Sequence, residues 1–351
     1  SVLVSQKFQK EGFRSAILKG QGNALWYPNP MHRMPGDIDI WLEGGREKIM
    51  AYVRHYFLKA SARYHHVDFP IIKGIDIEVH FTPTWMSAYP DNRFLQKWFA
   101  EEQEAQFANT VTLPENTGTI PVPTPAFNRI FLLIHIYRHF FDEGIGLRQL
   151  LDYAMLLNQG TTEKEKAESV RILKRMHLLR FTSALMHILQ NVFGIEGKHL
   201  LTAPSEKEGD FILQEIMQNG NFGQHNRNIN RQNGKSASYF TSKFLYKTRF
   251  LTRYPRETIW GHVFWIGQRI WRWHKIKGVG KKVAECTLLY GFGKYEIRVN
   301  KHLDEIPRQH PSRLPRRHET VCLRGLGTPS KHNGTDTHRN GKAPPACIHH
   351  P

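Results

Sequence analysis

Two carboxylates lie one residue apart in an otherwise apolar run near the start of the chain, Asp37 and Asp39. Side chains of a β-strand alternate between its faces, so the two acids would share one face while Ile38, Ile40 and Leu42 bury on the other. Adjacent like charges are costly unless a cation lies between them, and a divalent ion held by carboxylate oxygens is the expected partner. A pair of this kind is also compatible with a solvated turn before an edge strand.

A phosphate-binding turn is predicted upstream of these acids. Residues 17–27 have the pattern of a short apolar strand, a glycine turn and the start of a helix, with Lys19 directly before Gly20. The first turn of a helix offers unpaired backbone N–H groups and the positive end of its dipole, and both favour phosphate. Lys19 would add a positive charge. An ordinary turn is the alternative explanation of these glycines.

A second strand with alternating polar and apolar residues is predicted over residues 75–81. Asp76, Glu78 and His80 have the same parity, so they would lie together on one face of this strand. A solvent-facing strand edge is the alternative explanation of the two acids. The alternative for His80 is a partly buried imidazole, which is favoured over a catalytic role. The chain thus presents a glycine turn, a pair of acids and a later acidic strand, in that order.

This order of motifs resembles the nucleotidyltransferase superfamily that includes DNA polymerase beta, poly(A) polymerase and the antibiotic nucleotidyltransferases. More closely, the chain resembles the bacterial family usually called uncharacterised nucleotidyltransferases. The matching motifs are Lys19-Gly20, Arg33 to Asp39, Glu78-Val79-His80, His135 with His139, and Gly146 to Asp152. The resemblance covers about residues 14–155 and extends more loosely to about residue 300. One departure is Gln21, which stands where the superfamily usually has a serine.

The resemblance implies Mg²⁺-dependent transfer of a nucleoside monophosphate from a nucleoside triphosphate to a hydroxyl group. Asp37, Asp39 and Glu78 would be the catalytic acids and would hold about two Mg²⁺ ions, one on the triphosphate and one that activates the hydroxyl. Asp76 is the second choice for the third acid, and His80 would orient an acid or contact the substrate. The expected nucleotide-binding residues are Lys19, Gly20, Gln21, Arg33 and Gly36.

The acceptor stays open, because a reaction class does not identify the molecule that receives the nucleotide. Small molecules, proteins and RNA are all compatible with the motifs. The rival hypothesis is a non-catalytic module that binds nucleotide or RNA on the same fold. Transfer requires the acids of the second strand to approach Asp37 and Asp39, so the position of those acids distinguishes the two hypotheses.

Two histidines of the predicted helical region, His135 and His139, have the spacing of neighbours on one helix face. A metal site would need this spacing, but the glutamate of a zinc-protease motif is absent, since Ile136 follows the first histidine. The favoured interpretation is that both imidazoles line a cleft between domains or pack against Arg148 and Asp152.

Composition favours a polyanionic ligand. The 351 residues include 49 basic and 31 acidic side chains, for a net charge of +18, which suits nucleotides, nucleic acid or an anionic surface. The cysteines are Cys286, Cys322 and Cys347, without a C-x-x-C pair, which indicates a reducing compartment, the cytoplasm. No run of about 18 apolar residues predicts a membrane span. The chain begins at Ser1 without a signal-like segment, as a fragment would.

The predicted fold is α+β: a polymerase-beta-like nucleotidyltransferase domain with a mixed sheet at residues 1–120, then a helical domain at residues 124–305. A disordered basic tail is predicted at residues 306–351 from its proline, histidine and lysine content. Residues 119–124 carry two prolines and are expected to be irregular, which places the boundary there. Pro125 would start the first helix of the second domain.

The remaining elements follow from apolar periodicity. Strands are expected over residues 62–69 and 75–81, joined by residues 70–74. Helices are expected over residues 46–58, 92–107, 127–141, 163–179, 182–193, 238–250 and 258–275. Residues 259–282 combine five aromatic side chains with a basic run; we favour a core helix with snorkelling cations over contact with a membrane surface or stacking on nucleic acid.

Overall fold

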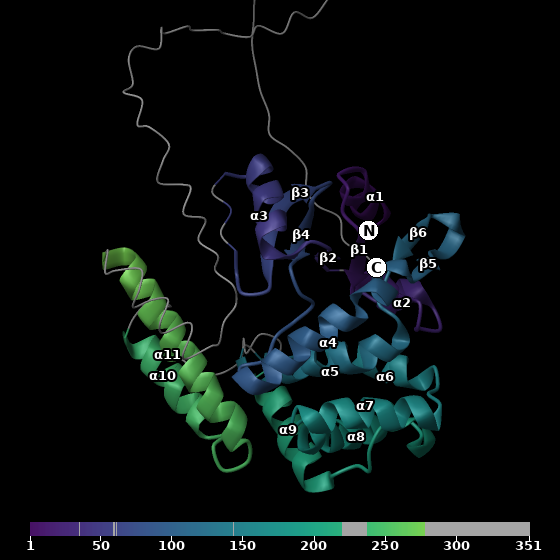
Figure 1. The fold of residues 1–351 in the computed structure, drawn as a ribbon. Helices are drawn as coiled ribbons and strands as arrows, with labels where there is room; N and C mark the ends of the chain where they lie inside the picture. Colours follow the sequence, from purple (N-terminus) through teal and green to yellow (C-terminus); the bar gives the residue numbers. More distant parts are fainter. Residues whose placement is uncertain (35, 59, 61, 143, 220–236, 278–351) are drawn as a thin grey trace, which may run out of the picture. The chain divides into compact units, whose positions relative to one another are not determined.

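A mixed four-stranded sheet carries the acidic residues (Figure 1). Its strand order is β1-β2-β4-β3. β1 (Ser15–Leu18) is antiparallel to β2 (Ile38–Leu42), which is parallel to β4 (Ile75–His80), and β3 (His66–Ile72) is the antiparallel edge strand beside β4. The parallel pair requires a crossover connection, and α3 (Gly45–Tyr56) lies in that connection. The predicted α+β class with a mixed sheet is therefore confirmed.

The computed structural model describes residues 1–34, 36–58, 60, 62–142, 144–219 and 237–277. The predicted tail, residues 306–351, lies outside these residues. All described residues belong to one compact unit, so the predicted boundary between two domains stays a prediction.

The sheet separates two apolar cores. The first core joins one face of the sheet to α1 (Val2–Lys10) and α3, and it contains alternate residues of the central strands: Ile38, Ile40, Leu42, Ile77 and Val79. The second core lies on the other face, where the Trp41 ring packs against Phe107 and Phe127. The expected burial of the apolar residues beside the two acids is confirmed, and Asp39 shares its face with Trp41, toward the helices.

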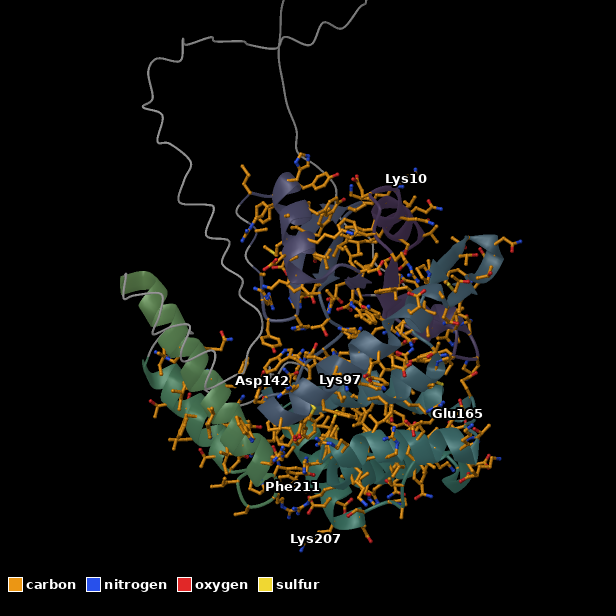
Figure 2. The ribbon with its side chains drawn as sticks, viewed as in Figure 1. Lys10, Lys97, Asp142, Glu165, Lys207 and Phe211 are labelled. Atoms are coloured by element: carbon orange, nitrogen blue, oxygen red, sulfur yellow. The ribbon has the colours of Figure 1, made fainter. Side chains whose placement is uncertain are left out.

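Helices supply most of the second core, and their side chains fill the space between them (Figure 2). They are α4 (Tyr89–Ala108), α5 (Pro125–Asp142), α6 (Leu147–Asn158), α7 (Glu163–Arg175), α8 (Leu179–Phe193) and α9 (Glu206–Asn219). Pro125 begins α5 as expected. The helix predicted over residues 163–179 ends earlier, at Arg175, because His177 has a positive φ of 60° that a helix does not tolerate.

Two strand predictions were wrong in detail. The segment expected at residues 62–69 is β3 at His66–Ile72, and its connection to β4 is only Lys73-Gly74, two residues with positive φ that close a tight hairpin. Pro70 is tolerated inside β3 because an edge strand pairs on one side only.

The segment expected to be irregular at residues 119–124 begins with a short strand. β6 (Thr119–Pro121) pairs with β5 (Thr110–Thr112) in a separate two-stranded sheet, where Pro121 lies opposite Thr110 at the end of the ladder. A proline at the end of a two-stranded ladder removes little pairing. The prolines therefore shorten the strand instead of excluding it.

The aromatic segment forms α11 (Pro255–Lys277), which follows α10 (Ala237–Thr248). Its half-buried Phe264 ring stacks on Trp85 with centroids 4.4 Å apart. A row of apolar side chains nevertheless stays exposed on it: Ile259, Val263, Ile266 and Ile270. Among the described residues, no helix is both long and apolar enough to cross a membrane.

Glu257, in the first turn of α11, gives a pH-dependent prediction. The side chain is buried, and burial raises its pKa to about 7, although hydrogen bonds with Ser87 and Tyr137 act in the opposite direction. The unfolded chain loses this proton near pH 4.5, so the free energy of unfolding falls as the pH rises from about 4.5 to 7. Glu257→Gln should remove the fall and add up to about 3 kcal/mol above pH 7, at about 1.36 kcal/mol per unit of pKa. Urea denaturation of the wild type and the variant at pH 5 and pH 8 measures the two free energies of unfolding.

Glu208 is the matched control for that experiment. It is also buried, but Arg180 and Arg253 bind its carboxylate at 2.6 and 2.9 Å. Although burial acts in the opposite direction, these arginines hold its pKa below the ordinary value. Glu208→Gln should therefore destabilise the protein near neutral pH. Equal effects of the two substitutions at pH 8 would contradict the assignment for Glu257.

Candidate functional site

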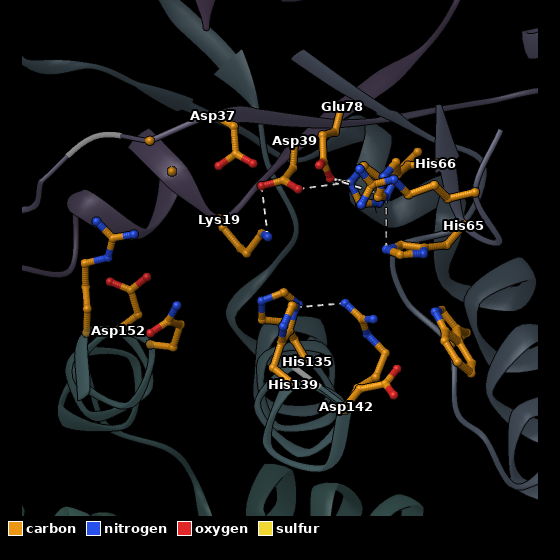
Figure 3. Close-up of a pocket in the computed structure, with 18 of the residues that line it drawn as sticks. Lys19, Asp37, Asp39, His65, His66, Glu78, His135, His139, Asp142 and Asp152 are labelled. Carbon is orange, nitrogen blue, oxygen red and sulfur yellow. Dashed lines mark hydrogen bonds and ion pairs between the residues drawn. The ribbon is translucent and has the colours of Figure 1, made fainter. Parts of the chain in front are cut away.

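The register of two parallel strands brings the predicted acids together. Asp39 of β2 lies directly opposite Glu78 of β4, so both carboxylates project from the same face (Figure 3). Asp39, Glu78 and His80 each offer one ligand atom within 4.8 Å of the others. Asp37 precedes the first residue of β2 and lines the same cavity, beside that group. Asp76 is exposed and is not among the residues that line the cavity.

Asp39 is paired with an ammonium group and an imidazole. Its Oδ2 lies 2.9 Å from the ammonium of Lys19, and its Oδ1 lies 3.0 Å from Nε2 of His80. Asp39 is 4% exposed, so an unpaired charge here would be expensive. Although burial acts in the opposite direction, Lys19 and His80 hold the pKa of Asp39 well below its ordinary value. Asp39 is therefore a carboxylate, and both of its oxygens are engaged.

The other acids differ from Asp39 in their surroundings. Burial and the neighbouring charge of Asp39 raise the pKa of Asp37. Glu78 has Oε2 3.6 Å from His80 Nε2. Although burial acts in the opposite direction, His80 lowers the pKa of Glu78. For His80, burial alone would lower the pKa, but the hydrogen bonds to Asp39 and Glu78 outweigh burial and raise the pKa of this imidazole.

A strained turn carries Lys19 to Asp39. Lys19 and Gly20 have positive φ values of 58° and 52°, where the short helix α2 (Gly20–Ala24) begins. A non-glycine residue in this region costs on the order of 1–3 kcal/mol, and such strain gathers at functional sites. The ion pair with buried Asp39 opposes this cost. Gly22 of the same helix packs so closely on Val122 that an added Cβ would lie 2.9 Å from its Cγ1.

The predicted nucleotide-binding residues divide into three groups. Lys19, Gly20 and Gly36 line the cavity. Gln21 does not, and its Oε1 accepts a hydrogen bond of 2.5 Å from Ser1 Oγ. Arg33 lines the cavity, but its guanidinium group is bound by Asp152.

Asp152 of α6 pairs with Arg33 in a bidentate ion pair of 2.9 and 2.7 Å. Tyr27 and Asn23 also donate to the Asp152 carboxylate, at 2.7 and 3.3 Å. Asp152 is 5% exposed. The arrangement ties the loop before β2 to the helical layer, so Arg33 has a positioning role in this structure.

A cavity of about 330 Å³ lies between the acidic strands and helices α5 and α6. From α5, His135 and His139 face it with ring centroids 4.3 Å apart, and Arg138 donates to His139 Nε2 at 2.8 Å. Burial and the charge of Lys19 lower the pKa of His135 well below its ordinary value. The two histidines line the cavity together with Arg148 and Asp152.

Several cavity residues were missed in the sequence. Arg63 and Arg138 add positive charge to the wall, while His65 and His66 lie beside His80. Arg138 could have been found, because its spacing from His135 places it on the same helix face. The two neighbouring histidines gave no periodic signal, since they lie at the start of an edge strand.

The fold and this site define a protein of the nucleotidyltransferase class, with acids on two adjoining parallel strands over a basic cavity. The chain belongs to the family described as uncharacterised nucleotidyltransferase, whose model matches residues 2–194. No curated protein matches the chain.

Among solved structures, the crystal structure of an antigenic nucleotidyltransferase-like protein from Paracoccidioides brasiliensis is similar, with 15% identity. The match covers 50% of this chain and 87% of that chain, with a TM-score of 0.30. A likeness of this degree adds nothing to the assignment, which rests on the family.

Proposed function

We propose that the protein is a Mg²⁺-dependent enzyme that transfers a nucleoside monophosphate from a nucleoside triphosphate to a hydroxyl of an acceptor, in the cytoplasm. The observation that carries the proposal is the pairing of Asp39 with Glu78 across parallel strands, with Asp37 beside them. Their oxygen donors fit Mg²⁺, which prefers carboxylates and keeps other positions for phosphates and water. When bound, the ion stabilises charge on the transferred phosphoryl group and activates the acceptor hydroxyl.

The chain's own residues account for binding of the triphosphate. Lys19 and Gly20 lie at the cavity on one side, and Arg138 and Arg148 line it from the helices. These side chains and the backbone of the glycine turn offer positive charge to phosphate oxygens. Because Lys19 is paired with Asp39 in this structure, it can contact phosphate after another cation has taken its place. Glu78, which is partly exposed to the cavity, is the group that can accept the acceptor's proton.

A second function, a non-catalytic module that binds nucleotide or RNA, is favoured by one observation. Both oxygens of Asp39 are already held by Lys19 and His80, so the carboxylate is balanced without a metal ion. In this alternative the basic cavity binds the polyanion and no bond is made.

One experiment distinguishes the two functions. Cell lysate is incubated with the protein and each α-labelled nucleoside triphosphate, with Mg²⁺ or with excess chelator. The proposal expects one acceptor to gain label only when Mg²⁺ is present. Nucleotide binding in calorimetry without any labelled product, in lysates from several sources, would favour the binding module.

Glu78→Gln is expected to keep nucleotide binding and to lose turnover. The amide preserves the shape of the side chain but cannot accept a proton, and general-base catalysis is worth about 10²–10⁴-fold. Calorimetry with a triphosphate gives the affinity, and release of pyrophosphate gives the rate. Asp76→Gln is the control, since this exposed acid of the same strand lies outside the cavity. If Asp76→Gln loses turnover and Glu78→Gln does not, the third acid is Asp76.

A further inference from the structure

Three histidine rings form a triangle in the wall of the cavity, beside Asp39 and Glu78. His65 and His66 have ring centroids 4.4 Å apart, and each lies 5.2 Å from the ring of His80. All three residues are at least nine-tenths buried, with exposures of 7%, 4% and 3%. One nitrogen from each ring lies within 4.8 Å of the others. Burial of three imidazoles side by side needs an explanation that apolar packing does not supply.

Each of these rings has a buried nitrogen without a hydrogen-bond partner among the described residues. The atoms are Nδ1 of His65, Nε2 of His66 and Nδ1 of His80. A buried polar atom left unpaired costs about 1–3 kcal/mol. A cation that accepts imidazole ligands would remove this cost and would also account for the convergence of the rings.

The contacts of the rings with carboxylates are those of metal-binding histidines. Ligating histidines usually give their second nitrogen to a carboxylate, which fixes the ring. His80 does this through Nε2, which lies 3.0 Å from Asp39, and its Nδ1 remains for a ligand. His66 Nδ1 lies 3.3 Å from Glu78 and 3.2 Å from His65 Nε2. These contacts occupy one nitrogen of each ring and leave His65 Nδ1, His66 Nε2 and His80 Nδ1 for a ligand.

We propose that His65, His66 and His80 form a binding site for a transition-metal dication of the Zn²⁺ type, which adjoins the oxygen site of Asp37 and Asp39 through the contact of His80 with Asp39 but uses other ligand atoms. Neutral imidazole suits Zn²⁺ and its neighbours in the series, whereas Mg²⁺ takes oxygen ligands. The three histidines belong to the wall of the same cavity. The histidines could hold such an ion whether or not the chain is a transferase.

The test measures binding of Zn²⁺ and Co²⁺ to the full chain. The sequence beyond residue 300 contains further histidines, among them His349 and His350, so total metal content is not informative. Wild type is therefore compared with the double substitution His65→Gln/His66→Gln and with His32→Gln, an exposed histidine outside the cavity. The expected result is loss of one tightly bound Zn²⁺ equivalent, in competition with a chromophoric chelator, from the double variant alone.

Two further measurements make the result decisive. Co²⁺ in the wild-type protein should give the intense visible absorption of tetrahedral coordination, which excess Mg²⁺ does not remove. Asp37→Ala should keep this absorption even if it weakens binding of Mg²⁺ with a triphosphate. The Co²⁺ spectrum therefore tests the histidine site independently of the proposed transferase activity. Equal Zn²⁺ stoichiometry in wild type and the folded double variant would overturn the proposal. If that variant does not fold, a wild type without the tetrahedral Co²⁺ band would overturn it.

Discussion

Replacing Asp39 with asparagine is expected to lower kcat/KM for nucleotidyl transfer by about 1,000-fold. Asparagine keeps the size of the side chain and a hydrogen bond to His80, but it removes the charge that a Mg²⁺ ion requires. Metal stabilisation of a phosphoryl transition state is worth several kcal/mol, and about 1.4 kcal/mol corresponds to tenfold in rate. The measurement is pyrophosphate release at saturating Mg²⁺, once the labelling experiment has identified an acceptor.

Asp76→Asn is the matched control for this substitution. Asp76 lies on the neighbouring strand with the same parity as Glu78, but it is exposed and outside the cavity. It should keep nearly full activity. Because Asp39 balances the charge of Lys19, a thermal melt must show that Asp39→Asn is folded at the assay temperature. A folded Asp39→Asn protein with more than about a tenth of wild-type activity would contradict the assigned role, since a lost metal contact costs far more.

Removal of the Arg33 side chain is expected to lower the free energy of unfolding by about 3–5 kcal/mol, the usual cost of breaking a buried ion pair on one side. Arg33→Ala leaves the Asp152 carboxylate, which is 5% exposed, with Tyr27 and Asn23 as its remaining donors. Urea denaturation at pH 7 measures the loss. The same substitution should weaken triphosphate binding only through misplacement of the loop before β2.

The control is Arg171→Ala on α7. Arg171 and Glu168 also form a bidentate pair, at 2.8 and 2.6 Å, but their side chains are 70% and 52% exposed. An exposed pair contributes about 0–1 kcal/mol, so this substitution should be nearly silent. Equal losses for the two arginine variants would mean that burial does not decide the effect and would remove the positioning role from Arg33.

Much of the acidic site could be predicted from the sequence because parity is a local property. Alternation along the strands placed Asp39 opposite its apolar neighbours and placed Glu78 with His80, and both arrangements are present. What alternation cannot give is the register between strands. The pairing of Asp39 with Glu78 depends on the parallel alignment of β2 and β4, which α3 and both cores fix.

The partners of the charged residues were beyond sequence reasoning. Lys19 was assigned to phosphate, yet in this structure it binds Asp39, and Arg33 binds a carboxylate more than a hundred positions away. Such pairs depend on long-range contacts between the sheet and the helices. The spacing of His135 and His139 could be recognised because both lie on one helix, while the cluster of His65, His66 and His80 combines an edge strand with its neighbour.

The ion pair between Lys19 and Asp39 has a consequence for the response of the protein to magnesium concentration. Any ion that takes Asp39 as a ligand must first displace an ammonium group that belongs to the polypeptide itself. The apparent dissociation constant for the ion therefore includes the free energy of separating that pair. A nucleotide whose phosphates attract the released ammonium offsets part of this free energy. Magnesium and nucleotide should accordingly bind with positive cooperativity, and neither should bind tightly alone.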